Sequence, residues 1–392
     1  MNFKLDNIKK NNEKLFFFST IGIILIILKS SIQVKTNFLI SNFFLAFGLI
    51  LINYSSYKLS SQLFLKRYVL NFFIFIILPI EIIIFFNDHI LDLTLTIFRV
   101  ICYNLAICGL IHGAHSKTKI IFNNKLKFFL NFLIFILLIF YLSEVNLSNF
   151  SSRYIILAYE MSAVGINYNY GLMCAVLIFL IVEEKINFFK FFYLINFLIS
   201  LYICLTTGSR GFVLGLFFVF LIAFYKNNFL ISFTKFLIVS FIVYFIFINF
   251  YQDFFFLIEN LINRFLNINF QYDNSVIERQ LIVQNYLNQW DKFIIFGLKN
   301  YNGPYPHNFF LDWIIRFGIF GILIIILIVK VLFKTISNKN KLLNNYFDFL
   351  IFGILIYSFL HSQVSLQIEY LRFFWFAASY FYIKEKLLNK FN

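Results

Sequence analysis

One short polar segment between two apolar runs carries residue types that bind anions. It reads Thr-Thr-Gly-Ser-Arg-Gly over residues 206–211. Ser209 is placed to cap the helix predicted after it, and the free N–H groups of a helix N-terminus attract negative charge. Arg210 adds a full positive charge beside them, so a phosphate group fits here. Taken alone, the spacing favours a simpler interpretation, which is a tight turn with an anchoring arginine.

A second candidate precedes a long apolar run. Two of the three prolines, Pro304 and Pro306, flank a tyrosine, and His307 and Asn308 follow directly. Proline biases the residue before it towards extended geometry, so the segment is expected to hold both polar residues at the start of the next helix. A histidine titrates near neutral pH and serves as a base or as a donor to phosphate oxygen. In isolation, a helix-capping or interfacial role is the simpler interpretation.

Further charged residues stand in apolar surroundings. Arg279 lies on a helix predicted to open at Ser275 and to run towards Trp290. Such an arginine either snorkels along a packed face or holds an anion in a cleft, and the spacing leaves both open. Glu81 and Arg99 lie at equal depth in consecutive antiparallel spans, so we expect a structural ion pair.

The elements that position these residues are membrane spans. Of the 392 residues, 61% are hydrophobic and 13% are charged, which excludes an ordinary soluble domain. The apolar windows predict an all-α polytopic membrane protein with about twelve transmembrane helices. The predicted spans are 15–34, 36–54, 68–86, 93–111, 128–145, 165–183, 191–207, 211–225, 229–249, 308–333, 347–361 and 370–383.

Positive charge predicts the orientation of these spans. With this assignment 21 Lys and Arg residues fall on the face that holds both termini, and 11 fall on the other face. The positive-inside rule makes the first face cytoplasmic. The excess of 33 basic over 18 acidic residues is therefore interpreted as membrane orientation, and we expect no nucleic-acid partner.

The same assignment divides the chain into three parts. Nine spans occupy 1–249, one large periplasmic loop with short helices occupies 250–306, and the last three spans occupy 307–392. A connection of this length is usually functional, and an amphipathic interfacial helix is expected near 254–266. The segments that hold Arg210, Arg279 and His307 all map to the outer face.

Motifs for cytoplasmic nucleotide or metal chemistry are absent from the sequence. It holds no Walker-type or G-x-G-x-x-G motif and no D-x-D, HExxH or clustered His/Cys pattern. We therefore expect no cofactor and no metal, and substrates that already lie on the outer side. The cysteines are expected to be small buried apolar residues, and they are Cys102, Cys108, Cys174 and Cys204.

Three of these motifs, in this order, resemble the O-antigen ligase and O-antigen polymerase superfamily. His307-Asn308, nine residues and then Gly318-x-x-Gly321 resembles its H-N-x9-G-x-x-G signature. Residues 207–211 resemble its T-G-S-R-G turn, and residues 273–297 resemble its loop segment ahead of the histidine. The resemblance covers roughly residues 160–330.

The resemblance implies a metal-independent glycosyltransferase of the bacterial inner membrane that uses an undecaprenyl-diphosphate-linked glycan donor at the periplasmic face. Arg210 and Arg279 would hold the diphosphate, and Ser209 and Asn308 would contact substrate. His307 would accept the proton of the acceptor hydroxyl or orient a phosphate oxygen. The acceptor is a second lipid-linked glycan in a polymerase and the lipid A core in a ligase, and the compact loop favours a polymerase.

A flippase or transporter of lipid-linked oligosaccharide, without transferase activity, is the alternative. Such a protein also has about a dozen spans, but it should show paired halves or helices broken at the midplane. Only Pro79 interrupts a predicted span, and the candidate residues gather at the outer surface. This placement favours the transferase.

The orientation can be tested directly. We predict that a reporter fused after Asn392 is cytoplasmic and that an epitope tag inserted within 250–306 is reached from the periplasm. Reporter activity and labelling of intact spheroplasts measure this. A periplasmic C-terminus would contradict the twelve-span assignment and would separate the candidate residues.

Overall fold

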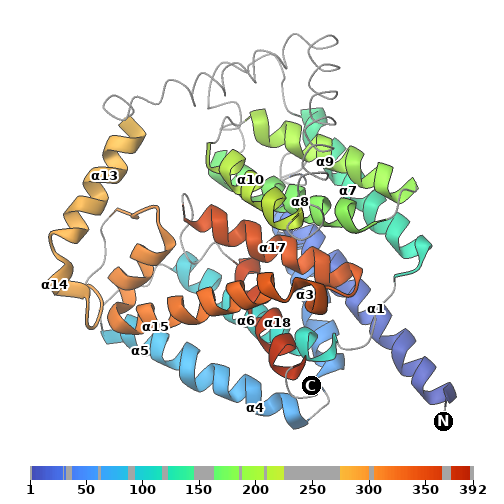
Figure 1. Cartoon of the computed structure of the whole chain (residues 1–392), viewed down its shortest axis with the longest axis horizontal. Helices are drawn as coiled ribbons and strands as arrows, with labels where there is room; N and C mark the ends of the chain where they lie inside the picture. Colours follow the sequence, from blue (N-terminus) through green and yellow to red (C-terminus); the bar gives the residue numbers. More distant parts are fainter. Residues whose placement is uncertain are drawn as a thin grey trace. The chain divides into compact units, whose positions relative to one another are not determined.

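The computed structural model is helical, and the residues it describes contain no strand (Figure 1). It describes residues 2–29, 31, 38–60, 63–86, 93–116, 122–144, 163–184, 188–206, 210–224, 274–299, 304–363 and 372–388. The all-α class predicted from the sequence is confirmed for these residues. The predicted span at 229–249 and the predicted amphipathic helix at 254–266 lie outside them.

The helices follow the predicted apolar segments. In chain order they are α1 (Asn2–Ile27), α3 (Phe38–Leu59), α4 (Leu63–Phe72), the π-helical turn η1 (Phe73–Ile77), α5 (Leu78–Phe86), α6 (Leu93–His115), α7 (Asn124–Glu144), α8 (Ala163–Glu183), α9 (Phe188–Thr206), α10 (Arg210–Phe224), α13 (Asn274–Leu287), α14 (Trp290–Phe293), α15 (Phe309–Ser337), α16 (Lys339–Leu342), α17 (Tyr346–Ser362) and α18 (Arg372–Leu388). Among the described residues, six helices are long and apolar enough to cross a membrane, namely α3, α6, α7, α8, α9 and α15.

Packing divides the chain into two units. The first comprises residues 1–22, 49–122 and 270–392, and the second comprises 23–48 and 123–269. Within the second unit α8 is the most enclosed helix, and it packs against α9 and α10. The Tyr170 hydroxyl on α8 lies 2.7 Å from the Ser31 hydroxyl, and Lys127 on α7 pairs with Glu184 at 2.8 Å. These polar contacts hold together helices that are otherwise apolar.

The first unit is organised by a close contact between α6 and α18. Gly109 and Gly113 stand one turn apart on α6, directly against the backbone of α18. A β-carbon at Gly109 would lie 2.2 Å from the Phe376 carbonyl oxygen, and one at Gly113 would lie 2.3 Å from that of Tyr380. This G-x-x-x-G pattern lets two backbones approach closely, which is a main source of helix association in lipid.

A buried ion pair joins α17 to α18. One oxygen of Asp348 accepts from the backbone N–H groups of Asn344 and Asn345, at 2.9 and 3.1 Å, and the other accepts from Lys384 and Tyr380. Asp348 is fully buried, and Lys384 is 2% exposed. A buried carboxylate is tolerated only when its oxygens are paired and hydrogen-bonded, so the cluster fixes α17 against α18.

The ion pair predicted between the third and fourth spans is confirmed. Arg99 Nε on α6 lies 3.4 Å from Glu81 Oε1 on α5, and the Tyr103 hydroxyl donates to the same oxygen at 2.7 Å. The expected burial of the cysteines is also confirmed, because all of them are buried as free thiols.

Pro79 explains an irregularity ahead of Glu81. Proline has no N–H group and clashes with the carbonyl four residues earlier, so a regular α-helix cannot continue through it unchanged. The chain widens into the π-helical turn η1, where the Leu78 N–H donates to the Phe73 carbonyl. Single π turns often occur at functional sites, and this one lines a pocket described below.

The contact between α6 and α18 gives a test of stability. We predict that Gly109→Leu lowers the free energy of unfolding by about 3 kcal/mol, because the new side chain meets backbone atoms that cannot rotate away. The midpoint of thermal unfolding in detergent measures this. Val100→Leu adds volume on the same helix at a side chain that is 58% exposed, and it should leave the midpoint unchanged. Equal midpoints for the two variants would contradict the close packing.

Candidate functional site

The helices of the large loop pack on the first half of α15. Tyr286 of α13, Phe293 of α14 and Ile315 of α15 form a buried cluster. The Tyr286 hydroxyl also donates to the Pro304 carbonyl oxygen at 2.9 Å. The predicted helix through Arg279 is present, but it ends at Leu287, before the expected end near Trp290. α14 begins there as a separate short helix, so the loop turns back onto α15.

At Gly318 the backbone of residues 295–298 forms hydrogen bonds with α15. Its φ is 56°, and the helix is kinked there. The Ile319 N–H donates to the Ile295 carbonyl at 3.2 Å, and the Leu298 N–H donates to the Ile315 carbonyl at 2.6 Å. A β-carbon at Gly318 would lie 2.3 Å from the Ile295 oxygen. Glycine is required because both the left-handed backbone and the space exclude a side chain.

His307 stands directly before α15 in an unusual backbone conformation. Its φ is 53°, in the left-handed region that residues other than glycine seldom adopt. Its ring meets the Tyr305 ring edge-on, with centroids 5.1 Å apart. Its Nδ1 is buried and has no hydrogen-bond partner among the described residues. Backbone strain and unsatisfied polar atoms of this kind concentrate at functional sites.

Asn308 is the N-cap of α15. Its backbone is extended, and its side-chain oxygen accepts from the Leu311 N–H at 3.0 Å. This cap satisfies a free donor of the first turn and fixes the direction in which α15 leaves His307. The structure thus gives Asn308 a positioning role, and its contact with substrate stays a prediction.

The charge of Arg279 acts on His307 although 27 residues separate them in the sequence. Partial burial lowers the pKa of His307 below its ordinary value, and the positive charge of Arg279 lowers that pKa further. The imidazole is therefore neutral at pH 7 and is able to accept a proton. Arg279 itself is exposed on α13, where an incoming anion can reach it.

The remaining predicted residues belong to the second unit. The backbone of Arg210 begins α10, in agreement with a helix that opens after the polar turn. Ser209 and the side chain of Arg210 lie outside the residues described. The predicted convergence of Arg210 with Arg279 and His307 therefore stays a prediction.

Sequence reasoning missed an ion pair within α15. Arg316 Nε lies 2.9 Å from Asp312 Oδ1, and Asp312 is fully buried. The available signal was a pair of opposite charges four residues apart in an apolar helix, which places them on one face. Asp312 follows Asn308 by one helical turn, so this pair lies close to the start of α15.

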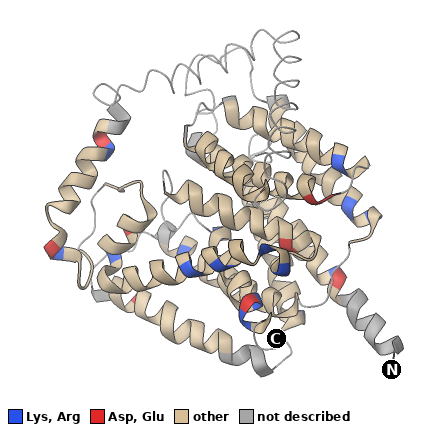
Figure 2. Cartoon of the chain, in the orientation of Figure 1, with Lys and Arg blue, Asp and Glu red and all other residues tan. Residues whose placement is uncertain are grey.

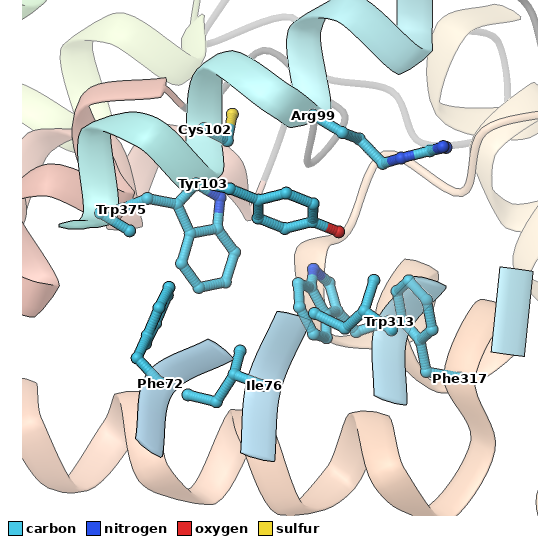
Figure 3. A pocket seen from close by; sticks show the side chains of 10 residues that line it. Phe72, Ile76, Arg99, Cys102, Tyr103, Trp313, Phe317 and Trp375 are labelled. Atoms are coloured by element: carbon cyan, nitrogen blue, oxygen red, sulfur yellow. The ribbon is translucent and has the colours of Figure 1, made fainter. Parts of the chain in front are cut away.

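Sequence reasoning also missed a pocket, because its walls come from distant segments. The pocket is small, with about 30 Å³ of space, and lies among α4 to α6, α15 and α18 (Figure 3). Its lining residues are Phe72, Ile76, Ile80, Arg99, Cys102, Tyr103, Ala106, Trp313, Phe317 and Trp375. Of the described residues that line the pocket, Arg99 alone is charged, and about half of the others are aromatic.

Charged groups are sparse on most helices, and α13, α14, α15 and α18 each carry both signs (Figure 2). Among the described residues, no group of three or more His, Cys, Asp or Glu side chains is placed to hold a metal ion. No protein-family model, curated protein or solved structure matches this chain. The class that the fold defines is an all-α protein with apolar helices of membrane-spanning length, and its function is argued from the site alone.

The electrostatic effect of Arg279 on His307 predicts a change in the pKa of the imidazole. In Arg279→Gln the pKa of His307 should rise towards the ordinary value near 6.5, because a positive neighbour disfavours a second positive charge. An NMR titration of the imidazole, assigned with His307→Gln, measures this. Lys292→Gln removes an exposed cation of α14 and should leave the pKa unchanged. An unchanged pKa in Arg279→Gln would show that the charge does not act on His307.

Proposed function

We propose that the protein is a glycosyltransferase of the O-antigen polymerase and ligase type. Its donor is a glycan linked to undecaprenyl diphosphate in the bacterial inner membrane. One observation carries the proposal, namely a neutral, strained His307 whose pKa responds to the exposed positive charge of Arg279, at the start of a long apolar helix. Both residues occupy positions singled out by the resemblance to that superfamily.

The chemistry needs a base and an anion-binding group at one place. A hydroxyl of the acceptor glycan attacks the anomeric carbon of the donor, and its proton passes to the imidazole of His307. The bond from the anomeric carbon to the diphosphate oxygen breaks, and the electron pair leaves with the diphosphate. Arg279 stabilises that developing charge by charge-assisted hydrogen bonds.

Arg210 belongs to the same proposal as a second cation for the diphosphate. A helix N-terminus attracts anions, and Arg210 stands at the beginning of α10. Ser209 would add a hydroxyl and Asn308 an amide to the substrate contacts. We further propose twelve spans, two cytoplasmic termini and a periplasmic site, which is the face where lipid-linked glycans are joined.

The acceptor separates two enzymes with the same donor chemistry. In a polymerase the acceptor is another lipid-linked repeat, and in a ligase it is the lipid A core. We favour the polymerase because the loop helices are short and packed on α15, which leaves little surface for a core oligosaccharide. Lipopolysaccharide of a deletion strain distinguishes the two, because loss of a polymerase leaves core with a single repeat and loss of a ligase leaves bare core.

Transfer activity tests the site itself. We predict that His307→Ala, Arg279→Ala and Arg210→Ala each reduce transfer per folded molecule by about 100-fold, the usual effect of losing a catalytic acid–base group or charge-stabilising donor. Arg279→Lys should also be impaired, because the ammonium group of lysine cannot form the bidentate phosphate contact of a guanidinium. The assay uses purified lipid-linked donor and enzyme in proteoliposomes.

Lys292→Ala is the matched control, because it removes an exposed cation from the neighbouring helix α14. It should retain full transfer. A chelator in the assay should have no effect if the reaction needs no metal. Full activity in His307→Ala and Arg279→Ala would refute the proposed site, and loss of activity with chelator would refute the metal-independent mechanism.

A further inference from the structure

The pocket around Arg99 holds polar donors without acceptors. Trp313 is 1% exposed, and its indole Nε1 has no hydrogen-bond partner among the described residues. Arg99 is 13% exposed, and its Nη2 also has no hydrogen-bond partner among these residues. Tryptophan and arginine only donate hydrogen bonds, so what both lack is an oxygen acceptor. Buried donors left unpaired are costly, and a bound group with several oxygens would satisfy them.

The ion pair beside the pocket leaves capacity for such a group. Arg99 reaches Glu81 only through Nε, at 3.4 Å, and this contact lacks hydrogen-bond geometry. The same Glu81 oxygen already accepts from Tyr103. Glu81 is 40% exposed, so its carboxylate can take a cationic partner from outside. A positive group and a negative group thus stand side by side, each able to accept a further partner.

The apolar walls of the pocket lead into a wider groove. Three residues, Phe72, Ile76 and Trp375, line both the pocket and a second hollow of about 300 Å³. Leu327 and Ile328 of α15 line this second hollow. The rings of Phe72 and Trp375 lie on the side of the pocket away from the Arg99 guanidinium (Figure 3). The path from Arg99 to the groove is therefore apolar and suits a hydrocarbon chain.

The depth of Arg99 matches a bilayer headgroup. Arg99 is the seventh residue of the span predicted at 93–111. At a rise of 1.5 Å per residue it lies about 9 Å from the start of that span, and the long side chain of an arginine reaches the polar membrane surface from this depth. A lipid would therefore enter the pocket without leaving its leaflet.

We propose that this pocket binds a zwitterionic phospholipid with a primary amine, of the phosphatidylethanolamine class. Arg99 holds the phosphodiester, Glu81 holds the ammonium group, and Trp313 donates to an ester carbonyl. One acyl chain lies along Phe72 and Trp375 towards the groove. The adjacent opposite charges select this headgroup over an anionic one, because a phosphate alone would place a negative charge near Glu81 with no ammonium group to offset the repulsion.

Binding of defined lipids to the delipidated full-length protein in detergent tests the proposal by native mass spectrometry. Phosphatidylethanolamine should bind about tenfold more tightly than phosphatidylglycerol, which lacks the ammonium group, and diacylglycerol should bind more weakly still. Glu81→Gln should remove the preference between the two phospholipids. Arg99→Gln should remove the preference of both over diacylglycerol. Arg372→Gln is the matched control, because it removes the arginine stacked on Phe98 outside the pocket.

Trp313→Phe keeps one aromatic ring and removes the N–H donor together with the second ring of the indole, so it tests the pocket even if a variant of the ion pair fails to fold. It should weaken phosphatidylethanolamine binding several-fold while gel filtration and circular dichroism stay unchanged. Equal binding of the three lipids, tighter binding of phosphatidylglycerol, or unchanged binding in Trp313→Phe would overturn the proposal. Displacement of the lipid by millimolar inorganic phosphate would overturn it as well, because a free anion would then be the ligand.

Discussion

The first unit depends on the backbone contact between α6 and α18. Gly109 and Gly113 bring the two helices so close that carbonyl oxygens of α18 occupy the space of the missing side chains. In a membrane the hydrophobic effect does not draw helices together, so close van der Waals packing must do so. The contact fixes the helix that carries Arg99 beside the helix that carries Trp375 and Lys384. A pocket and a buried ion cluster follow from this one pairing.

Polar groups in this unit stabilise the arrangement because they are paired. The carboxylate of Asp348 receives two backbone and two side-chain donors. His112 of α6 lies 2.6 Å from the Ser19 hydroxyl of α1 through Nε2. A buried charge that loses its partner destabilises the fold by about 3–5 kcal/mol. The unpaired donors of Arg99 and Trp313 share one pocket, and for that reason we propose it as a binding site.

The site at the start of α15 depends on a second backbone constraint. Gly318 interrupts the helix so that loop backbone around Ile295 is able to hydrogen-bond into it. The loop is then held against α15 by the cluster of Tyr286, Phe293 and Ile315. Burial in this arrangement, and after it the charge of Arg279, lower the pKa of His307 and keep the imidazole neutral. Gly318, eleven residues after His307, thus affects the electrostatics of the site, because it lets the segment that carries Arg279 pack on α15.

The sequence by itself determined the helical class, the position of most apolar segments, the pair of Glu81 with Arg99, and the motif residues around His307. Hydropathy and spacing act over short stretches, where helix geometry decides which residues share a face. Only the tertiary structure decided the contact of α6 with α18, the pairing of Asp348 with Lys384, and the pocket at Trp313. Those features join segments more than 30 residues apart, and local patterns do not encode which distant helix supplies the partner. The left-handed backbone of His307 belongs with them, because surrounding packing, and not residue preference, holds a non-glycine residue there.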